Sequence, residues 1–365
     1  MRRLLIYCLF VLVLNSHIVY AQVLFEENTV WALEADAGIA EHFVYGLEVG
    51  NNGVILAFSE GRIRANDTSP HHIVLKRSLD KGKTWLPSQI LAQSNNNECY
   101  ANPTPVKDPA TGNITLFYAL NLNNERTKVF FIISKDEGLT WSKPLEITAL
   151  FNSDPLLRPF HLPGPGHGIA LKNGRLIVQV WHRFSVKLPL EERRYGVSVI
   201  YSDDQGKSWK AGGYMPYNNL YPANESRIVE TSDGKIILNG RYATGKGNQY
   251  RILTYSNDNG LNWSEGTYSS FSTFTPVDAG LNKLTIGRKT YQLFSYPAGP
   301  GRNNLMISIS EDEGKTWLKS KLIAKGPVNY SDIAILPDQT ILVLYGKGNP
   351  KYVVNARFNL EWILK

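Results

Sequence analysis

The stretch Ser78-Leu79-Asp80-Lys81-Gly82-Lys83-Thr84-Trp85 contains the pattern Ser-x-Asp-x-Gly-x-x-Trp, and this pattern decides the fold. An aspartate side chain can accept hydrogen bonds from the backbone N–H groups of a turn, and a glycine can adopt a positive φ. A tryptophan three residues later can fold back onto the turn as an apolar plug. We therefore expect the stretch to form the tip of a β-hairpin.

The pattern occurs five times along the chain. The other four copies are Ser134/Asp136/Gly138/Trp141, Ser202/Asp204/Gly206/Trp209, Ser256/Asp258/Gly260/Trp263 and Ser310/Asp312/Gly314/Trp317. Each copy directly follows a run that is rich in β-branched and aromatic residues, which favour strands. These runs cover residues 72–77, 129–133, 197–201, 251–255 and 305–309. The chain is therefore built from a repeated strand-and-turn unit.

The spacing of the copies predicts the architecture. They recur about every 55 residues, a period that is typical of four-stranded β-propeller blades. One interval is longer and contains a Pro/Gly-rich insertion at residues 156–168. We predict an all-β, six-bladed β-propeller that forms a single domain over residues 22–365. Its sixth blade would join the N-terminal segment to C-terminal strands that cover residues 352–363, because this closes the ring and removes an exposed strand edge.

The first 21 residues have the features of an export signal. Two arginines directly after Met1 precede an apolar run over residues 4–14, and Ala21 offers a small residue at a cleavage point. We therefore expect an exported protein, either periplasmic or secreted. Cleavage would also remove Cys8 and leave Cys99 as the single cysteine, so we expect no disulfide within the mature chain.

Composition and charge exclude several classes of protein. Apolar residues make up 43% of the chain and charged residues 19%, which excludes a disordered protein. The net charge is +7, but the lysines and arginines are scattered, so we expect no nucleic-acid partner. No segment after the export signal is long and apolar enough to predict a membrane span. We also find no zinc-ligand spacing and no glycine-rich nucleotide loop, and therefore predict neither a metal nor a cofactor.

Several further segments lie between the five turns. They are residues 57–62 with Asp67, residues 102–106, residues 164–169, residues 224–227 with Arg241, residues 301–305 and residues 329–332. Together with the five turns, which we call Asp boxes, they resemble the sialidase (neuraminidase) superfamily with its BNR repeats. The resemblance spans nearly the whole mature chain. It implies an exo-α-sialidase-like glycoside hydrolase with its active site at one end of the propeller axis and the Asp boxes at the periphery.

The resemblance also implies a role for three catalytic residues. Members of the family cleave a terminal sialic acid, whose anomeric carbon carries a carboxylate that would repel a carboxylate nucleophile. Tyr330 would therefore be the nucleophile and Glu225 the base that takes its proton. Asp67 would protonate the leaving oxygen and later activate water, a role that requires a raised pKa.

Three arginines complete the implied site. Arg241 and Arg302 would hold the substrate carboxylate, because a planar guanidinium binds a carboxylate through two parallel hydrogen bonds. Arg62 would line the pocket and contact either the sugar or Asp67. The expected partner is a glycan with a terminal acidic sugar, and we expect the protein to act as a monomer.

Two positions depart from the family. Its first triad arginine lies about twenty residues before the equivalent of Arg62, where this chain has no arginine at residues 41–46. The glutamate that steadies this arginine is also missing, because the late strand reads Leu344-Tyr345-Gly346. Loss of both partners avoids a stranded charge and suggests a redesigned subsite. His42 could supply one compensating hydrogen bond.

The departures keep two alternatives open. The protein could hydrolyse a different terminal sugar, or it could be a glycan-binding propeller without activity. Four other residues also allow two interpretations. Trp181 and His182 could shape the sugar pocket or pack at a strand end, and His161 and His167 flank a Pro/Gly-rich loop in which a structural role is expected for His167.

Overall fold

The computed structural model describes residues 23–95, 97–244, 250–272, 276–349 and 351–365. The predicted export signal at residues 1–21 lies outside this part of the chain. Nearly all regular structure is antiparallel β-sheet, with two short 3₁₀ helices and one short α-helix. Among the described residues, no helix has the length and apolar character needed to cross a membrane.

The strands form six four-stranded blades. Blades 1 and 2 contain β2 (Glu41–Val49), β3 (Ile55–Arg62), β4 (His71–Ser78) and β5 (Gln89–Ala92), then β6 (Cys99–Lys107), β7 (Ile114–Leu122), β8 (Arg126–Ser134) and β9 (Leu145–Glu146). Blades 3 and 4 contain β10 (Phe160–Pro163) with β11 (Ile169–Ala170), β12 (Leu176–Arg183), β13 (Gly196–Ser202) and β14 (Lys210–Tyr214), then β15 (Ala223–Glu230), β16 (Ile236–Tyr242), β17 (Tyr250–Ser256) and β18 (Thr267–Ser272). Blades 5 and 6 contain β19 (Gly280–Ile286), β20 (Lys289–Gly299), β21 (Asn303–Ser310), β22 (Lys319–Ile335), β23 (Ile341–Lys347), β24 (Tyr352–Phe358) and β1 (Phe25–Trp31).

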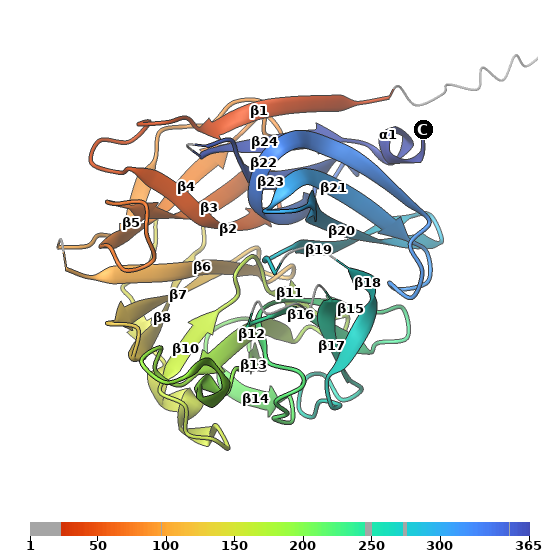
Figure 1. Cartoon of the computed structure of the whole chain (residues 1–365). Coiled ribbons are helices and arrows are strands. Elements are labelled where there is room, and N and C mark those ends of the chain that lie inside the picture. Colours follow the sequence, from red (N-terminus) through yellow and green to blue (C-terminus); the bar gives the residue numbers. More distant parts are fainter. Residues whose placement is uncertain (1–22, 96, 245–249, 273–275, 350) are drawn as a thin grey trace, which may run out of the picture.

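The blades follow one another around a common centre in chain order (Figure 1). Their first strands are innermost: β2 contacts β6 and β22, and β15 contacts β12 and β19. Strand β22 belongs to two blades, because its first half pairs with β21 and its second half pairs with β23. Hydrophobic clusters fill the spaces between neighbouring blades. The predicted six-bladed propeller is confirmed.

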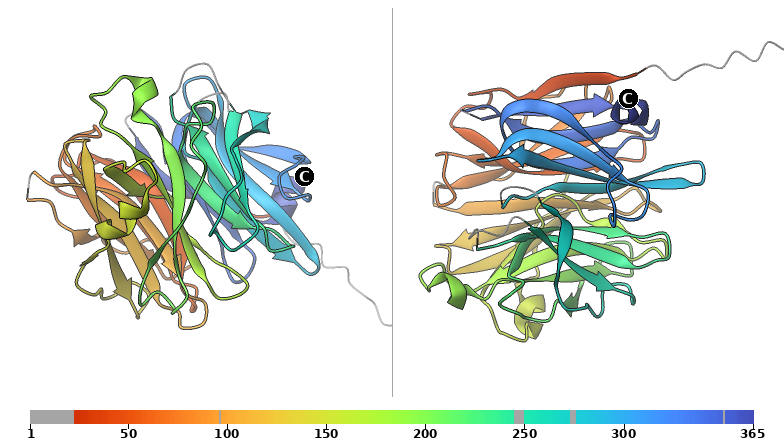
Figure 2. Two further views of the ribbon diagram at one scale, coloured as in Figure 1. Left: turned by 90° about the horizontal axis from the view of Figure 1, so that it is seen from below. Right: turned by 45° about the vertical axis from the view of Figure 1, so that its right-hand side comes forward.

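The ring closes through its two ends, as predicted. Strand β1 pairs antiparallel with β24, and the red N-terminal strand lies beside the blue C-terminal strands in two views (Figures 1 and 2). The prediction of strand as far as residue 363 is wrong, because β24 ends at Phe358 and helix α1 (Leu360–Leu364) follows. The Asn359 side chain caps this helix by accepting a hydrogen bond from the Trp362 N–H. This turn buries Leu360 and Ile363.

Each Asp box connects the third and fourth strands of a blade, and the third box illustrates its hydrogen bonds. Asp204 Oδ1 accepts hydrogen bonds from Ser202 Oγ at 2.8 Å and from the Ser208 N–H at 2.9 Å. Gly206 has a φ of +82° and donates its N–H to Ser202 Oγ at 2.9 Å. The aspartate thus satisfies the backbone of a tight turn, and glycine supplies the left-handed conformation.

The tryptophans of the boxes fasten neighbouring blades together. The Trp209 ring of blade 3 packs edge-on against Phe117 of blade 2 at 4.6 Å, and Trp141 of blade 2 packs against Phe58 of blade 1 at 6.0 Å. Trp85 of blade 1 donates its Nε1–H to Asn355 of blade 6 at 2.9 Å. Each of these tryptophans is expected from the sequence to cover its own turn, and the structure shows that it also contacts the neighbouring blade.

Blade 3 contains a buried pair of histidines. His161 Nδ1 lies 2.8 Å from His182 Nδ1, and His182 Nε2 lies 2.7 Å from Ser198 Oγ. The Phe151 ring stacks on His161 at 4.5 Å. Burial lowers the pKa of His161 to about 4 and lowers the pKa of His182 well below its ordinary value. Both imidazoles are therefore neutral in the folded protein at pH 7.

We predict that Asp204→Ala lowers the free energy of unfolding by about 1–2 kcal/mol, because it removes the cap of the turn. Chemical denaturation followed by tryptophan fluorescence measures this change. Lys207→Ala is the matched control, because Lys207 is exposed in the same turn and should change stability by less than about 0.5 kcal/mol. Equal effects of the two substitutions would contradict the capping role.

We also predict an acid-dependent loss of stability from the histidine pair. An unfolded histidine takes up a proton below its ordinary pKa of 6.5, whereas the folded His161 stays neutral until about pH 4. Stability should therefore fall from pH 6.5 toward pH 4, by on the order of 2–3 kcal/mol. His161→Asn keeps a donor near His182 and should weaken this pH dependence in denaturation experiments. Parallel stability curves for the variant and the wild type would exclude the pair as the source.

Candidate active site

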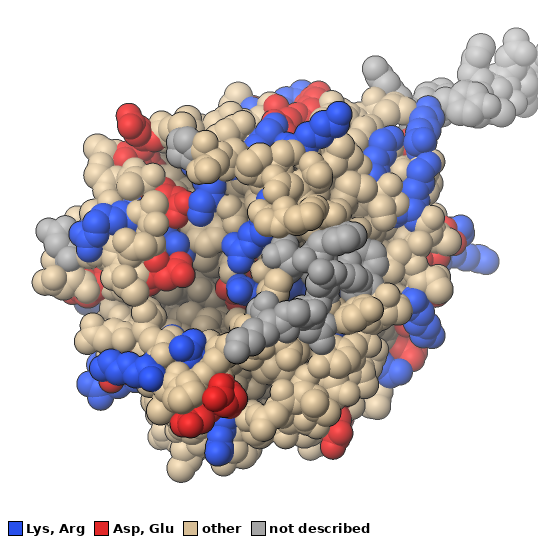
Figure 3. Space-filling view, in the orientation of Figure 1, with Lys and Arg blue, Asp and Glu red and all other residues tan. Residues whose placement is uncertain are grey.

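A cavity of about 340 Å³ lies where the inner strands of the blades meet. It is lined by all six residues that the sequence singled out: Arg62, Asp67, Glu225, Arg241, Arg302 and Tyr330. Figure 3 shows a hollow on this face of the molecule, with acidic and basic side chains around it. A second cavity, of about 270 Å³ between blades 4 and 5, contains none of these residues. The six residues come from blades 1, 4, 5 and 6 and meet in one pocket.

β-Bulges in the innermost strands direct two of these side chains into the cavity. In β15, Asn224 and Glu225 together oppose the single residue Arg241 of β16. In β22, Asn329 and Tyr330 oppose Gly346 of β23 in the same way. A bulge interrupts strand pairing and re-aims side chains, and bulges are frequent beside functional sites. The bulge in β15 also explains why Arg241 lies directly beside Glu225.

The inner strands of blades 1 and 2 are interrupted at corresponding places. Val44 is an extra residue in β2 with a φ of +57°, and β6 bulges at Asn102, whose φ is +55°. A positive φ is strongly disfavoured for a β-branched residue such as valine. Both residues line the cavity. Val44 is therefore a strained backbone position at the edge of the pocket.

Tyr330, Glu225 and Arg241 form a hydrogen-bonded cluster that joins blades 4 and 6. Tyr330 Oη lies 2.6 and 2.7 Å from the two carboxylate oxygens of Glu225. Arg241 Nη1 donates to Tyr330 Oη at 2.8 Å and also to Glu225. Burial and the adjacent Glu225 carboxylate raise the pKa of Tyr330 well above its ordinary value. The phenol is therefore protonated at rest, with a carboxylate in place to accept its proton.

Arg302 lies beside this cluster on the turn between β20 and β21. Its backbone has a φ of +61°, and its Nη1 donates to Asn329 Oδ1 at 3.1 Å. The guanidinium lies 5.3 Å from the centre of the Tyr330 ring. Arg241 and Arg302 thus approach the phenol from different blades, in an arrangement that could bind one carboxylate between them.

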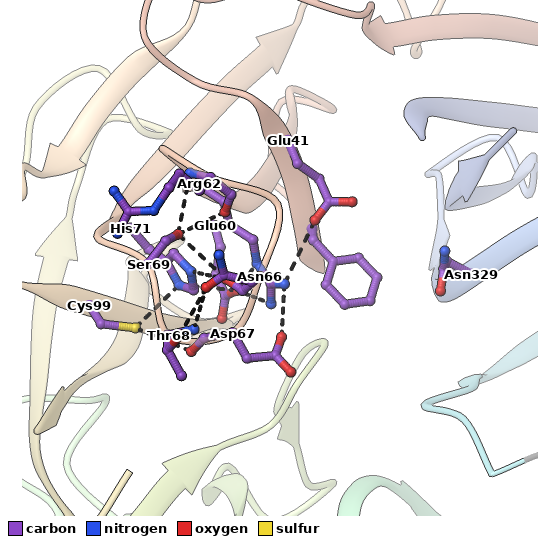
Figure 4. A network of polar contacts seen from close by, with 12 residues as sticks. Glu41, Glu60, Arg62, Asn66, Asp67, Thr68, Ser69, His71, Cys99 and Asn329 are labelled. Atoms are coloured by element: carbon purple, nitrogen blue, oxygen red, sulfur yellow. Dashed lines mark hydrogen bonds and ion pairs between the residues drawn. The ribbon is translucent and has the colours of Figure 1, made fainter. Parts of the chain in front are cut away.

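Asp67 and Arg62 lie on the opposite side of the cavity (Figure 4). Arg62 Nη1 lies 2.8 Å from Asp67 Oδ1, and the Asp67 side chain is 82% exposed. Arg62 also donates two hydrogen bonds to Glu60, at 2.7 and 2.9 Å, and lies 3.7 Å from Glu41. Three carboxylates thus surround one guanidinium, and Asp67, one of the two partners expected for Arg62, is in contact with it.

The suggestion that His42 replaces the missing arginine is wrong. His42 stacks on Trp31 at 4.9 Å and lies 3.2 Å from Asp36, and it does not line the cavity. The cavity instead receives Phe43, whose ring centre lies 4.8 Å from that of Tyr330. Side chains alternate along a strand, so His42 and Phe43 face opposite sides of β2.

Packing also explains why this chain has Gly346 where the family has a glutamate. A Cβ atom at Gly346 would lie only 2.6 Å from the hydroxyl oxygen of Tyr45, on the strand that carries Phe43. The Tyr45 side chain, which is 1% exposed, therefore fills the space that a side chain at residue 346 would need. Phe43 in the cavity wall and the buried Tyr45 thus lie on the strand that lacks the arginine of the family.

For the other residues with two possible roles, the structure shows which of them line the cavity. Trp181 lines the cavity. His161, His167 and His182 do not line it. His182 contacts His161, and His167 lies 2.9 Å from the buried carboxylate of Asp332. The structural role expected for His167 fits this contact.

Sequence reasoning missed several residues of the cavity wall. These residues are Glu60, His71, Cys99, Asn102, Phe160, Arg183 and Tyr195. The alternation of β3 could have indicated Glu60, which lies two residues before Arg62 on the same face. No local signal identifies Cys99 or Tyr195, because the fold alone brings them to the pocket.

In the described part of the chain, no three His, Cys, Asp or Glu side chains are grouped so that they could hold a metal ion.

Comparisons with known proteins agree with this geometry. The family described as "BNR repeat-like domain" matches residues 53–343. The sialidase of Micromonospora viridifaciens is 28% identical over 362 residues, which cover 91% of this chain and 53% of that protein. The sialidase of Bacteroides fragilis is 28% identical over 345 residues, which cover 85% of this chain and 60% of that protein. This chain thus spans little more than half the length of these two relatives.

A solved structure shows the same fold. The Hadza microbial sialidase Hz136 superposes with a TM-score of 0.80 at 24% identity, over 92% of this chain and 69% of that chain. The family match covers most of the chain, from blade 1 to blade 6. The chain therefore belongs to the BNR repeat-like domain family and, with it, to the sialidase superfamily.

Proposed function

We propose that this protein is an exo-acting glycoside hydrolase that releases a terminal sialic acid, or a related acidic keto-sugar, from glycans with retention of configuration. The observation that carries the proposal is the contact of Tyr330 Oη with both carboxylate oxygens of Glu225, at 2.6 and 2.7 Å. This pair lies in a cavity that is also lined by Asp67, Arg241 and Arg302. The relatives named sialidase support the same reaction.

In the first step, Tyr330 Oη attacks the anomeric carbon and passes its proton to Glu225. Arg241 Nη1, 2.8 Å from the phenol oxygen, stabilises the negative charge that develops there. Asp67 donates a proton to the leaving oxygen as the glycosidic bond breaks. The products of this step are the released aglycone and a sugar covalently bound to Tyr330.

In the second step, water replaces the tyrosine. Asp67, now a carboxylate, takes a proton from the water molecule as its oxygen attacks the anomeric carbon. The bond to Tyr330 breaks and Glu225 returns the proton to the phenolate. Because each step inverts the anomeric carbon, the released sugar retains its original configuration.

The choice of a phenol indicates an anionic substrate. A carboxylate on the anomeric carbon would repel a carboxylate nucleophile, whereas a neutral tyrosine avoids this repulsion until its proton leaves. Arg241 and Arg302 lie beside Tyr330 and would bind the substrate carboxylate. Arg62 is already surrounded by Glu60, Asp67 and Glu41 and would contribute little to this binding.

A second candidate is an acidic sugar other than the common sialic acids. The specific observation is that Phe43 lines the cavity beside Tyr330, and that the buried Tyr45 leaves no room for a side chain at residue 346. Two guanidinium groups rather than three would then hold the carboxylate, and Phe43 would face an apolar part of the sugar ring. An eight-carbon keto-sugar acid is the alternative substrate that we consider.

We also propose that the protein is exported and acts as a monomer. Two arginines followed by an apolar run over residues 4–14 support export. Sialylated glycans are found outside the cytoplasm, which agrees with this location.

We predict that Tyr330→Phe lowers turnover of a fluorogenic sialoside by more than about 10³-fold, because it removes the nucleophile. Asp67→Ala should lower kcat by about 10²–10⁴-fold on substrates with poor leaving groups. Tyr118→Phe is the matched control, because Tyr118 is a buried tyrosine that does not line the cavity. If Tyr330→Phe keeps full activity, the proposed nucleophile is wrong. Sugar binding without turnover by the wild type would instead indicate a glycan-binding propeller.

We further predict that Arg302→Gln raises KM for acidic sugars by about 10- to 100-fold, because hydrogen bonds to charged groups contribute about 1.5–3 kcal/mol. Initial rates on a panel of nine-carbon, eight-carbon and neutral terminal sugars measure this effect. Arg288→Gln is the control, because Arg288 is exposed on the β19–β20 turn. Efficient release of a neutral sugar that is unaffected by Arg302→Gln would contradict an acidic substrate.

A further inference from the structure

Asp67 presents a problem of positioning. It lies in the loop of residues 63–70 between β3 and β4, and its side chain is 82% exposed. Its carboxylate is held from one side by Arg62 at 2.8 Å. A general acid must be placed within hydrogen-bond reach of the leaving oxygen, so the backbone of this exposed loop has to be fixed in space.

The loop has an internal framework of hydrogen bonds. Asn66 Oδ1 accepts from the N–H and from the hydroxyl of Thr68, at 3.0 Å each. Ser69 Oγ donates to the Arg64 carbonyl at 2.7 Å, and the Ile63 N–H donates to the Pro70 carbonyl at 3.0 Å. These bonds define the shape of the loop, but they do not attach Asn66 and Asp67 to the wall of the cavity.

His71 and Cys99 provide that attachment from the wall beside the loop (Figure 4). His71 Nε2 lies 2.9 Å from the Asn66 carbonyl oxygen. Cys99 Sγ lies 3.8 Å from the Asp67 carbonyl oxygen and 3.4 Å from His71 Nδ1. The two side chains come from adjacent blades, because His71 starts β4 and Cys99 starts β6.

The hydrogen-bond chemistry fixes which nitrogen of His71 contacts the loop as a donor. A carbonyl oxygen only accepts, so Nε2 must carry the proton that it donates to Asn66. The other nitrogen, Nδ1, lies 3.4 Å from the Cys99 sulfur. Burial raises the pKa of the Cys99 thiol to about 12, so the thiol keeps its proton. The chain therefore runs from Cys99 through His71 to the residue before Asp67.

Burial makes this chain rigid. His71 is 1% exposed and Cys99 is 7% exposed, although both border the cavity. Glu60, whose carboxylate lies 3.6 Å from His71 Nδ1, is occupied by two hydrogen bonds from Arg62 and one from the Asn102 N–H. The proposed reaction assigns no step to His71 or Cys99. Their shared contact is the backbone of the loop that carries Asp67.

We propose that His71 and Cys99 are positioning residues that hold Asp67 at the leaving oxygen. This inference rests on the proposed role of Asp67 as the general acid. A displaced acid slows bond cleavage when the leaving group needs a proton, and matters little when the leaving group departs as an anion. The signature of the role is thus a loss of activity that depends on the leaving group.

The test compares two isosteric substitutions on two substrates. His71→Gln places its amide nitrogen near the position of Nε2 and can still donate to Asn66, whereas His71→Asn is too short to reach it. On sialyllactose, whose sugar leaving group needs a proton, we expect His71→Asn to lower kcat/KM by about 10- to 100-fold. On the 4-methylumbelliferyl sialoside, with its acidic leaving group, we expect a change of less than about threefold. His71→Gln should restore most of the activity on sialyllactose, and Cys99→Ala should show a smaller loss with the same selectivity.

Two controls make the outcomes distinct. His72→Gln changes the neighbouring histidine, which accepts from the Ser94 N–H outside the cavity, and should leave both rates unchanged. Thermal unfolding of each variant reports any loss of folding. Equal losses on both substrates, or no loss for His71→Asn, would overturn the positioning role while the proposed function stands. No turnover of either substrate by the wild type would overturn the proposed function and this inference with it.

Discussion

The closure of the ring is the constraint on which the rest of the structure depends. A four-stranded sheet buries both faces only when it packs between two neighbours, and the last blade has a neighbour only if the chain returns to its start. Strand β1 pairs with β24 and supplies this closure, with Trp31 fully buried at the seam. The tryptophans of the Asp boxes then join each blade to the preceding one, as Trp209 and Trp141 show. No disulfide links the described residues, because their one cysteine, Cys99, is a free thiol, so packing and hydrogen bonds hold the blades together.

Closure of the ring brings the innermost strands together, and bulges in these strands direct Glu225 and Tyr330 into the cavity. Regular pairing would turn alternate side chains of β15 and β22 into the spaces between blades. The bulges at Asn224–Glu225 and Asn329–Tyr330 interrupt the pairing at the level of the cavity. Glu225 and Tyr330 therefore meet across the axis although they are 105 residues apart in the sequence.

The charges in the cavity are arranged in two groups with different tasks. On one side, Glu60, Glu41 and Asp67 surround the Arg62 guanidinium. On the other side, Arg241 and Arg302 lie beside Tyr330, and Arg241 is paired with Glu225. Phe43 lies between the two groups, because its ring centre is 4.6 Å from the Arg62 guanidinium and 4.8 Å from that of Tyr330. This asymmetry agrees with a proton donor on one side of the sugar and an anion-binding site on the other.

The repeat, the number of blades and the closure of the ring could be read from the sequence, and its resemblance to the sialidase superfamily indicated the six residues of the pocket. These features depend on local chemistry, since an Asp box specifies its own turn, and on motifs that lie within a few residues of each other. The tertiary structure decided which neighbours those residues acquire. Whether His42 or Phe43 faces the cavity depends on a bulge at Val44, and the contact of Cys99 with the Asp67 loop joins blades 1 and 2. Such contacts arise from the packing of distant segments, and no local pattern of residues encodes them.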